Sequence, residues 1–332
     1  MSPGAEMRRR EFVLLVGGAA SAMAWPVAAG AQQRRRLPVV GVLSPFNNDE
    51  TTFLANLREG LRDYGYVEGK NLRIEYRSAE GRVELLPDLV SDIIRHNPDI
   101  IVTSSAPAIQ VVRQITSAIP IVFARVGDAV NQGIVTSLAR PGGNITGISW
   151  FAPELSGKNL EILKEVFPNM SHVAIFREAA AGAASAIAAD ASARRLGLKT
   201  AIFQARTSGE LETAFVGMLD AKVDSLVVLE GLMIFNNAKA IAGLARKARL
   251  PSIFFDSAFV DAGGLVSYGP NFVEMHRRAA YFVDRILKGS KAGDLPVEQP
   301  TKFDLVINVG TAAKLGLTIA PGLLLRADRV VE

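Results

Sequence analysis

The sequence lacks cysteine altogether and has only three histidines among its 332 residues. Without cysteine, the chain has no disulfide, no thiolate nucleophile and no cysteine-ligated metal site. His96, His172 and His276 lie far apart in the sequence and show no metal-ligand spacing. We therefore expect each histidine on the surface of a helix or strand, rather than as a metal ligand or a general base.

Motifs that bind phosphate or activate a nucleophile are also missing. The sequence has no Gly-x-x-x-x-Gly-Lys-Ser/Thr loop and no Gly-x-Ser-x-Gly elbow. After the first predicted strand, "GVLSPF" does not contain the Gly-x-Gly-x-x-Gly turn that dinucleotides require. The sequence therefore predicts that the protein is not an enzyme, and that it has no catalytic residue, metal or cofactor.

Long hydrophobic runs are scarce as well. The apolar run Phe12–Ala24 has 13 residues, whereas a membrane-spanning helix needs about 20. The basic cluster Arg8–Arg10 precedes this run and the small residues Ala29–Ala31 follow it, an order typical of a signal peptide. The arginine pair resembles a twin-arginine export signal. Pro26 disfavours the alternative of an ordinary cytoplasmic helix.

Neither sign of charge dominates the chain. It has 37 lysines and arginines against 33 acidic residues, and three of the arginines lie in the predicted leader. A nearly neutral and dispersed charge does not favour a nucleic-acid partner. Together with the leader, this predicts an exported protein that loses residues 1–31 and is soluble in the periplasm.

Short β-branched runs alternate with amphipathic helical patterns, first before and again after the turn-forming sequence "RPGGNITG" at residues 140–147. This alternation predicts two similar α/β halves with parallel sheets. The stretch Ala179–Ala193 is expected to be helical because alanine has the highest helix propensity. Asn271 and Glu274 form a capping pattern that should open a helix ending at Gly289. Strands are predicted at residues 37–44, 71–77, 99–105, 119–125, 172–176, 199–204, 225–230, 251–256 and 303–309.

Several segments, in this order, resemble the family of ABC-transporter substrate-binding proteins that includes tryptophan- and tyrosine-binding members. They include "GYVEGKNLRIEYRSAEG", "GIVTSLARPGGNITGIS", "AGGLVSYGP" and "ILKGSKAGDLPVEQPTKFDLVINVGTAAKLGLTI". The likeness runs from about Val39 to the C-terminus. It implies the type I periplasmic binding protein fold, with two doubly wound parallel-sheet α/β lobes, a three-strand hinge and a ligand in the cleft between the lobes.

The resemblance also implies where each lobe begins and ends. Lobe 1 is expected at residues 37–149 and 265–290, and lobe 2 at residues 151–256 and 301–332. The hinge segments would pass near residues 149–152, 256–263 and 291–300. Relatives are usually monomers that work with an ABC permease in the inner membrane, so both properties are expected here.

Candidate ligand-binding residues follow the predicted strands. In parallel sheets, ligands bind beyond the carboxyl ends of the strands, where helices begin and their free N–H groups favour anions. The candidates at these positions are Ser44, Phe46, Asn47, Ser104, Ser105, Arg125, Asp128, Arg177, Glu230, Asp256 and Tyr268.

Some of these candidates suggest specific roles. Ser104 and Ser105 would hold a ligand carboxylate at a helix start, although either also suits a simple helix N-cap. Asp128 would accept a ligand ammonium or hydroxyl group, or would only cap the following helix. Phe46 and Tyr268 would stack on an apolar or aromatic ligand, with Tyr268 in the core as the alternative.

Three positions depart from the pattern of the family. Arg125 lies where a small or apolar residue is common, and would either favour a carboxylate-bearing ligand or point away as a surface arginine. Ala129 follows Asp128 where the family usually has proline. The sequence "REAAAGA" at residues 177–183 replaces a loop that often contains asparagine and proline, which leaves the second half of the site poorly defined.

The predicted function is that of an extracytoplasmic solute-binding protein. It would capture a small organic solute, such as an amino acid or another carboxylate, aromatic ones included, and deliver it to an ABC importer. The alternative is a ligand-sensing periplasmic module that acts on a membrane receptor. Both functions need the same cleft, so the sequence does not separate them.

Overall fold

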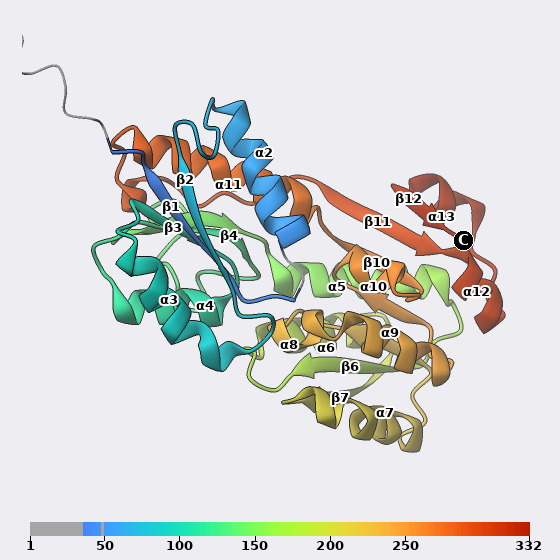
Figure 1. Cartoon of the computed structure of the whole chain (residues 1–332). Helices are drawn as coiled ribbons and strands as arrows, with labels where there is room; N and C mark the ends of the chain where they lie inside the picture. Colours follow the sequence, from blue (N-terminus) through green and yellow to red (C-terminus); the bar gives the residue numbers. More distant parts are fainter. Residues whose placement is uncertain (1–35, 48–49) are drawn as a thin grey trace, which may run out of the picture. The chain divides into compact units, whose positions relative to one another are not determined.

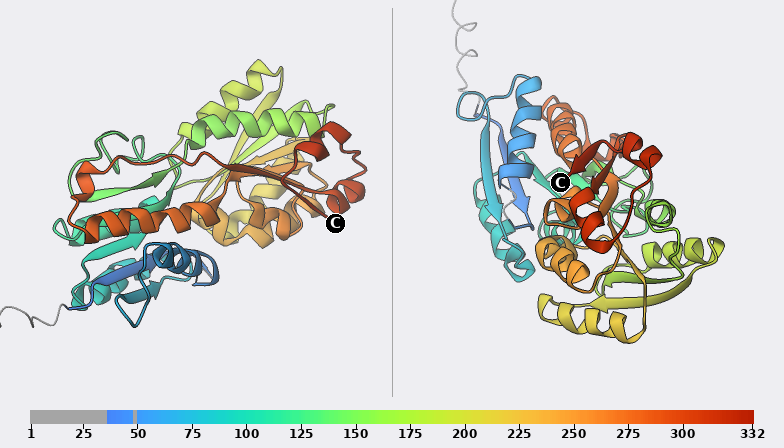
Figure 2. Two further views of the ribbon diagram at one scale, coloured as in Figure 1. Left: turned by 90° about the horizontal axis from the view of Figure 1, so that it is seen from above. Right: turned by 90° about the vertical axis from the view of Figure 1, so that its right-hand side faces the viewer.

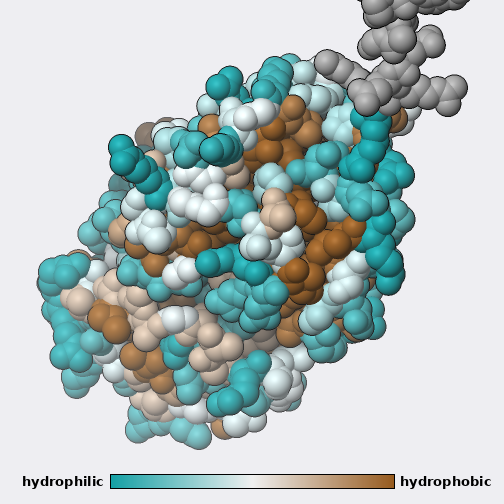
Figure 3. Space-filling model, turned by 90° about the vertical axis from the view of Figure 1, so that its left-hand side faces the viewer, coloured by the Kyte–Doolittle hydropathy of each residue, from teal (hydrophilic) through white to brown (hydrophobic). Residues whose placement is uncertain are grey.

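The computed structural model describes residues 36–47 and 50–332, and these residues form two β-sheets with helices packed against them (Figure 1). The predicted export signal at residues 1–31 lies outside the described residues. Among the helices of the described part, none combines the length and the apolar character needed to cross a bilayer. The space-filling view shows apolar patches broken up by polar side chains on one face (Figure 3).

The first sheet has five parallel strands in the order β2-β1-β3-β4-β5. All residues of β1, β3, β4 and β5 are buried, as expected for parallel strands covered on both faces. The strands are β1 (Val39–Ser44), β2 (Arg73–Ser78), β3 (Ile100–Thr103), β4 (Ile121–Val126) and β5 (Ile145–Ser149).

Helices cover both faces of the first sheet (Figure 1). On one face, a π-helical turn at Glu50–Leu54 leads into α2 (Ala55–Asp63), and α2 packs beside α11 (Phe272–Leu287). On the other face lie α3 (Leu86–Arg95) and α4 (Ala106–Ile115). A 3-10 turn at Val83–Leu85 precedes α3. The apolar stripes expected from the sequence are therefore the faces that these helices bury.

The second sheet has seven strands in the order β12-β11-β10-β9-β8-β6-β7. Its pairs are parallel except for β10 with β11, which is antiparallel and departs from the purely parallel sheet predicted from the sequence. The strands are β6 (His172–Glu178), β7 (Lys199–Ala205), β8 (Ser225–Val228), β9 (Ser252–Phe254), β10 (Val266–Pro270), β11 (Phe303–Asn308) and β12 (Arg329–Val331).

Helices pack on both faces of the second sheet, and each face has its own apolar cluster between helices and strands. Helix α6 begins at Ala184, five residues later than the sequence predicted. Residues 179–183 form a loop instead, because Ala179 N–H bonds to Ala205 O and Ala181 N–H bonds to Glu178 O. The helices are α5 (Ala152–Val166), α6 (Ala184–Arg195), α7 (Leu211–Asp220), α8 (Leu232–Asn236), α9 (Ala238–Lys247), α10 (Ser257–Asp261), α12 (Val309–Leu315) and α13 (Pro321–Arg326).

Strand β10 lies in the second half of the protein, not in the first half as the sequence predicted. The sequence interpretation placed residues 265–290 in lobe 1, but β10 pairs with β9 and β11 in the second sheet. A Cβ atom on Gly269 would lie 1.8 Å from Phe255 O, so glycine allows this close approach. Only α11 returns, starting at Asn271, whose side chain accepts the N–H of Glu274 at 2.9 Å as the capping pattern predicted.

Three connections therefore join the two halves. The first follows β5 at residues 150–151, the second lies between β10 and α11, and the third runs from residue 295 to β11 (Figure 2). The third connection pairs with β5 through a bridge between Ile148 and Glu298. The expected hinge at residues 256–263 is wrong, because these residues form α10 against β9, β10 and β11.

His276 in α11 is buried, with 2 % of its surface exposed, so its expected surface position is wrong. Its ring lies 4.9 Å from the ring of Phe53, and neither ring nitrogen has a hydrogen-bond partner within the described part of the chain. Burial, together with the positive charge of Arg125, lowers the pKa of His276 to about 3. The sequence did not indicate that α11 is packed on more than one side, between α2 and the strands.

Candidate ligand-binding site

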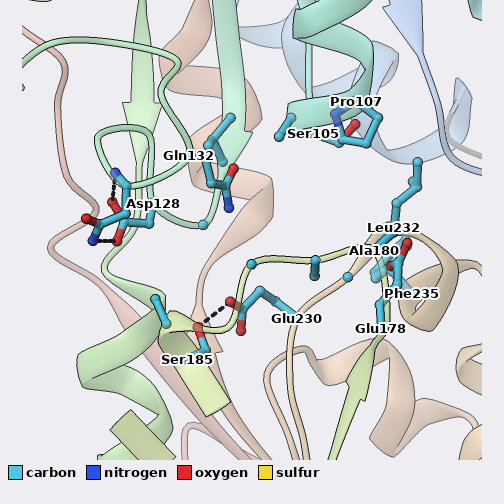
Figure 4. A pocket seen from close by; sticks show the side chains of 18 of the residues that line it. Ser105, Pro107, Asp128, Gln132, Glu178, Ala180, Ser185, Glu230, Leu232 and Phe235 are labelled. Atoms are coloured by element: carbon cyan, nitrogen blue, oxygen red, sulfur yellow. Dashed lines mark hydrogen bonds between the residues drawn. The ribbon is translucent and has the colours of Figure 1, made fainter. Parts of the chain in front are cut away.

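A cavity of about 410 Å³ lies between the carboxyl ends of strands from both sheets (Figure 4). The first sheet contributes Ser105 and Pro107 after β3 and the segment 125–132 at the end of β4. The second sheet contributes residues 178–185 after β6 and residues 230–235 after β8. The volume is within the range typical of small-molecule sites.

Five of the sequence-predicted candidates line this cavity: Phe46, Ser105, Arg125, Asp128 and Glu230. They belong to segments that are up to 184 residues apart in the sequence (46 to 230), and the two sheets bring them together. The other six candidates, Ser44, Asn47, Ser104, Arg177, Asp256 and Tyr268, are not among the residues that line it.

Arg125 is buried and already paired inside the protein. Its Nη2 lies 3.1 Å from Asp256 Oδ2, and the two side chains are 7 % and 8 % exposed. The guanidinium also lies over the rings of Phe46, Phe235 and Phe272, at 5.0, 4.2 and 3.6 Å from their centroids. Burial raises the pKa of Asp256, while the charge of Arg125 opposes that rise. The alternative of a surface arginine is therefore wrong, and Arg125 links the first sheet to the second.

Ser105 has a strained backbone at the start of α4. Its φ of 68° and ψ of 147° lie in a region that favours glycine. Its N–H donates to Arg125 O at 3.0 Å, but its hydroxyl makes no capping bond and has no hydrogen-bond partner within residues 36–47 and 50–332. Ser105 therefore occupies the N-cap position of α4, but its side chain does not cap the helix. Ser104 is fully buried behind it, also with an unpaired hydroxyl.

Two further residues with unpaired polar atoms line the cavity, and the sequence interpretation missed both. Trp150 is 3 % exposed, and its Nε1 finds no acceptor in the described chain. Its ring is held against Phe255 and Phe272, with centroids 5.8 and 5.2 Å away. Gln132 Oε1 is buried without a donor. No sequence signal showed where these side chains point, because both lie in connecting segments.

Two carboxyl groups, one from each half, also line the cavity. Asp128 accepts hydrogen bonds from the backbone and the side-chain nitrogen of Asn131, at 3.1 and 2.6 Å, so it caps a turn rather than a helix. Glu230 accepts a hydrogen bond from the hydroxyl of Ser185. Burial raises the pKa of Glu230 and the negative charge of Asp128 adds to the rise, against the Ser185 bond and the charge of Arg177.

A third carboxyl group, Glu178, has a structural partner. Its Oε2 accepts the N–H of Met233 at 2.9 Å and so caps the start of α8. A Cβ atom on Gly231 would lie 2.4 Å from this oxygen, so glycine leaves room for it. Burial raises the pKa of Glu178, while the backbone N–H groups of α8 oppose the rise. The sequence interpretation did not include this residue.

The remaining candidates make contacts outside the cavity. Ser44 Oγ accepts the N–H of Phe46 at 3.2 Å. Asn47 donates its backbone N–H to Asn236 Oδ1 at 3.0 Å, which joins the β1 connection to the end of α8. The expected stacking role of Tyr268 is not supported, because its ring lies in the second-half core, stacked on Phe303 at 5.9 Å.

Arg177 is turned away from the cavity. Its guanidinium donates to Gln204 Oε1 at 3.0 Å and to Ala181 O. The residue therefore supports the loop after β6 rather than lining the site itself. Within the described residues, no group of three or more histidine, aspartate or glutamate side chains could hold a metal ion.

Two lobes with a ligand-sized cavity between their strand ends define a solute-binding protein of the type I periplasmic class. The family model "ABC transporter substrate binding protein" matches residues 40–331, and the chain belongs to this family. A tyrosine-binding protein of Clostridioides difficile (strain R20291) is 26 % identical over 262 residues, which cover 78 % of this chain and 75 % of the relative.

Solved structures show the same fold. A conserved domain protein from Vibrio cholerae superposes with a TM-score of 0.82 at 28 % identity, covering 89 % of this chain and all of the other. The ABC domain from Streptococcus pneumoniae in complex with L-Trp also gives a TM-score of 0.82, at 24 % identity and with the same coverage. Both agree with the fold that the sequence predicted.

Proposed function

We propose that this protein captures a small organic solute in the cavity between its two sheets and delivers it to an ABC permease in the inner membrane. The observation that carries this proposal is the set of unpaired buried polar atoms on the cavity wall, on Ser105, Gln132 and Trp150. An unpaired buried polar group is costly in a folded protein, so such groups point to a ligand that pairs with them.

The proposed solute has an apolar or aromatic body and a polar end, as an amino acid has. Phe46, Phe235, Phe255 and the ring of Trp150 supply apolar wall. The hydroxyl of Ser105 at the start of α4 is suited to a carboxylate or another acceptor. The names of the tyrosine-binding relative and the L-Trp complex support an amino-acid-like solute without fixing which one.

Capture would work by closure of two lobes. We propose lobe 1 as residues 37–149 with α11, and lobe 2 as residues 151–270 with residues 301–332. A solute that contacts both lobes stabilises the closed state, because only that state offers all of its contacts. We further propose that the protein is exported by its twin-arginine leader, acts as a monomer in the periplasm and catalyses no reaction.

The test is a thermal-shift screen of the exported protein against amino acids, aromatic amines and small carboxylates. A solute at about 100 times its Kd adds about 2.7 kcal/mol to the free energy of unfolding. Gln132→Leu should weaken the hit at least tenfold, whereas Gln114→Leu, on the exposed side of α4, should leave it unchanged. Equal effects of both substitutions would contradict the proposed cavity.

Uptake of the labelled solute then separates transport from sensing. Cells that lack the protein should lose uptake of the hit if the protein serves an importer. Unchanged uptake, with a changed transcriptional response to the solute, would instead favour the sensory alternative. Steady turnover of the solute by the purified protein would contradict the proposal that it is not an enzyme.

A further inference from the structure

The charges that line the cavity are unbalanced. Among the described residues that line it, the ionisable side chains are Arg125, Asp128, Glu178 and Glu230. Arg125 is already paired with Asp256, which is not part of the lining. Three carboxyl groups therefore face a cavity whose one lining cation is engaged elsewhere.

The three carboxyl groups are not equivalent. Glu178 caps α8, which gives it a structural partner. Within the described part of the chain, the hydrogen-bond donors to Asp128 and Glu230 are neutral: Asn131 for Asp128, and the Ser185 hydroxyl and a backbone N–H for Glu230. A carboxylate that is buried with neutral donors alone retains a charge that a nearby cation would stabilise further.

Asp128 comes from the first sheet and Glu230 from the second, and the charge of Asp128 acts on Glu230. The negative charge of Asp128 contributes to the raised pKa of Glu230, after burial, which is the larger cause. The other charged groups near Glu230 are Glu178, on the neighbouring strand, and Arg177, whose guanidinium is bonded to Gln204 and Ala181. Closing the halves on an empty cavity therefore brings like charges together, which is unfavourable.

An independent observation shows that the place is built for a ligand. Trp150 lines the same cavity, and only 3 % of its surface is exposed. Its Nε1–H has no acceptor in the described chain. A solute that binds here must bring a hydrogen-bond acceptor for this N–H. The acidic pair thus belongs to a wall that a ligand completes, rather than to a solvated surface.

We infer that the solute carries a positively charged nitrogen group, held between Asp128 and Glu230, and that the cavity selects organic solutes of net positive charge. This inference rests on the proposed function. A protonated amine, amidine or guanidinium donates hydrogen bonds to both carboxylates and removes their mutual repulsion, so it stabilises closure directly. A zwitterion adds no net charge, and its carboxylate would meet an already acidic wall.

Three probes with one phenol ring test the charge preference by isothermal titration calorimetry. Tyramine carries only an amine, L-tyrosine carries an amine and a carboxylate, and 3-(4-hydroxyphenyl)propanoate carries only a carboxylate. We expect tyramine to bind at least tenfold more tightly than L-tyrosine, and the propanoate to bind most weakly.

Substitutions then test the carboxyl pair. Glu230→Gln should reduce the ratio of tyramine affinity to L-tyrosine affinity at least fivefold, and Asp128→Asn should also reduce the ratio. Glu154→Gln, at an exposed position in α5, is the matched control and should leave the ratio unchanged. The ratio is the decisive readout, because a merely structural effect of a substitution would weaken both probes alike.

The outcomes separate this inference from the proposed function. If L-tyrosine or the propanoate binds more tightly than tyramine, or if Glu230→Gln leaves the ratio unchanged, the inference is overturned and the proposed function stands. If neither these probes nor any solute of the wider screen binds, both are overturned.

Discussion

Replacing Asp256 with asparagine tests the buried ion pair that links the two sheets. The substitution keeps the shape of the side chain, and its Oδ1 can still accept the N–H of Ala258, which Asp256 accepts at 2.8 Å. It removes the negative charge that lies 3.1 Å from the guanidinium of Arg125. The substitution therefore removes the charge that balances Arg125 but keeps the hydrogen bond that caps α10.

The expected cost follows from burial. Removing one member of a buried ion pair typically costs about 3–5 kcal/mol, because the other charge stays buried without its partner. Arg125 keeps the faces of three aromatic rings, and contacts of this kind are worth about 0.5–2 kcal/mol. We therefore expect the loss of stability to be at the lower end of this range, about 3 kcal/mol. Since each kcal/mol lowers the Tm of a protein of this size by about 2 °C, the Tm should fall by about 6 °C.

The assay is thermal and urea unfolding of Asp256→Asn beside a matched surface control. Asp261→Asn removes a carboxylate that lies 2.7 Å from Arg329 Nη1, in a pair whose side chains are 50 % and 46 % exposed. Exposed pairs contribute about 0–1 kcal/mol. Arg125→Met should destabilise like Asp256→Asn, and the double variant should recover part of the loss. The reasoning is refuted if Asp256→Asn costs no more than Asp261→Asn.

Three further substitutions test other parts of the structure. Ser105→Gly should stabilise the protein by about 1 kcal/mol, because glycine relieves the strain of a φ of 68°. The same substitution should weaken solute binding, because the hydroxyl is lost. Unfolding measures the stability and titration measures the binding, and a loss of stability would contradict the strain argument. His276→Leu should flatten the acid sensitivity of unfolding. The pKa of about 3 in the folded state lies below the usual 6.5, so between those values mainly the unfolded chain binds this proton. Stability therefore falls as the pH drops, by about 1.6 kcal/mol from pH 6.5 to 5. The raised pKa of Asp256 acts in the opposite direction in both proteins, so the difference between them is the readout, and parallel curves would contradict the assignment. Gly269→Ala should destabilise by more than 2 kcal/mol, since its Cβ would meet Phe255 O at 1.8 Å; a Tm equal to that of Gly243→Ala, where nothing lies within 4 Å, would contradict it.

Much of the fold could be predicted because local signals decided it. Strands β1, β3 and β4 are buried apolar runs, and Asn271 with Glu274 marked the start of α11. The sheet to which β10 belongs was not predictable in this way. Its sequence is compatible with either sheet, and the pairing depends on the close approach of Gly269 to Phe255, which only the folded chain shows.

The candidate site was predictable to the level of strand ends, but not to the level of contacts. Ser105, Asp128 and Glu230 were found because residues after parallel strands meet at one edge. Arg125 and Asp256 were also named, but their mutual ion pair spans 131 residues and has no local signal. Trp150 was missed because a sequence does not show whether an indole N–H in a connecting segment finds an acceptor.

The central claim is that the solute binds between the two sheets and contacts both. A crystal structure of the exported protein with the solute that gives the largest thermal shift tests it most directly. The account predicts that the solute lies in the cavity, with contacts to Trp150 or Ser105 from one side and to Glu230 from the other. A solute found outside the cavity, or touching residues of one sheet alone, would contradict the account.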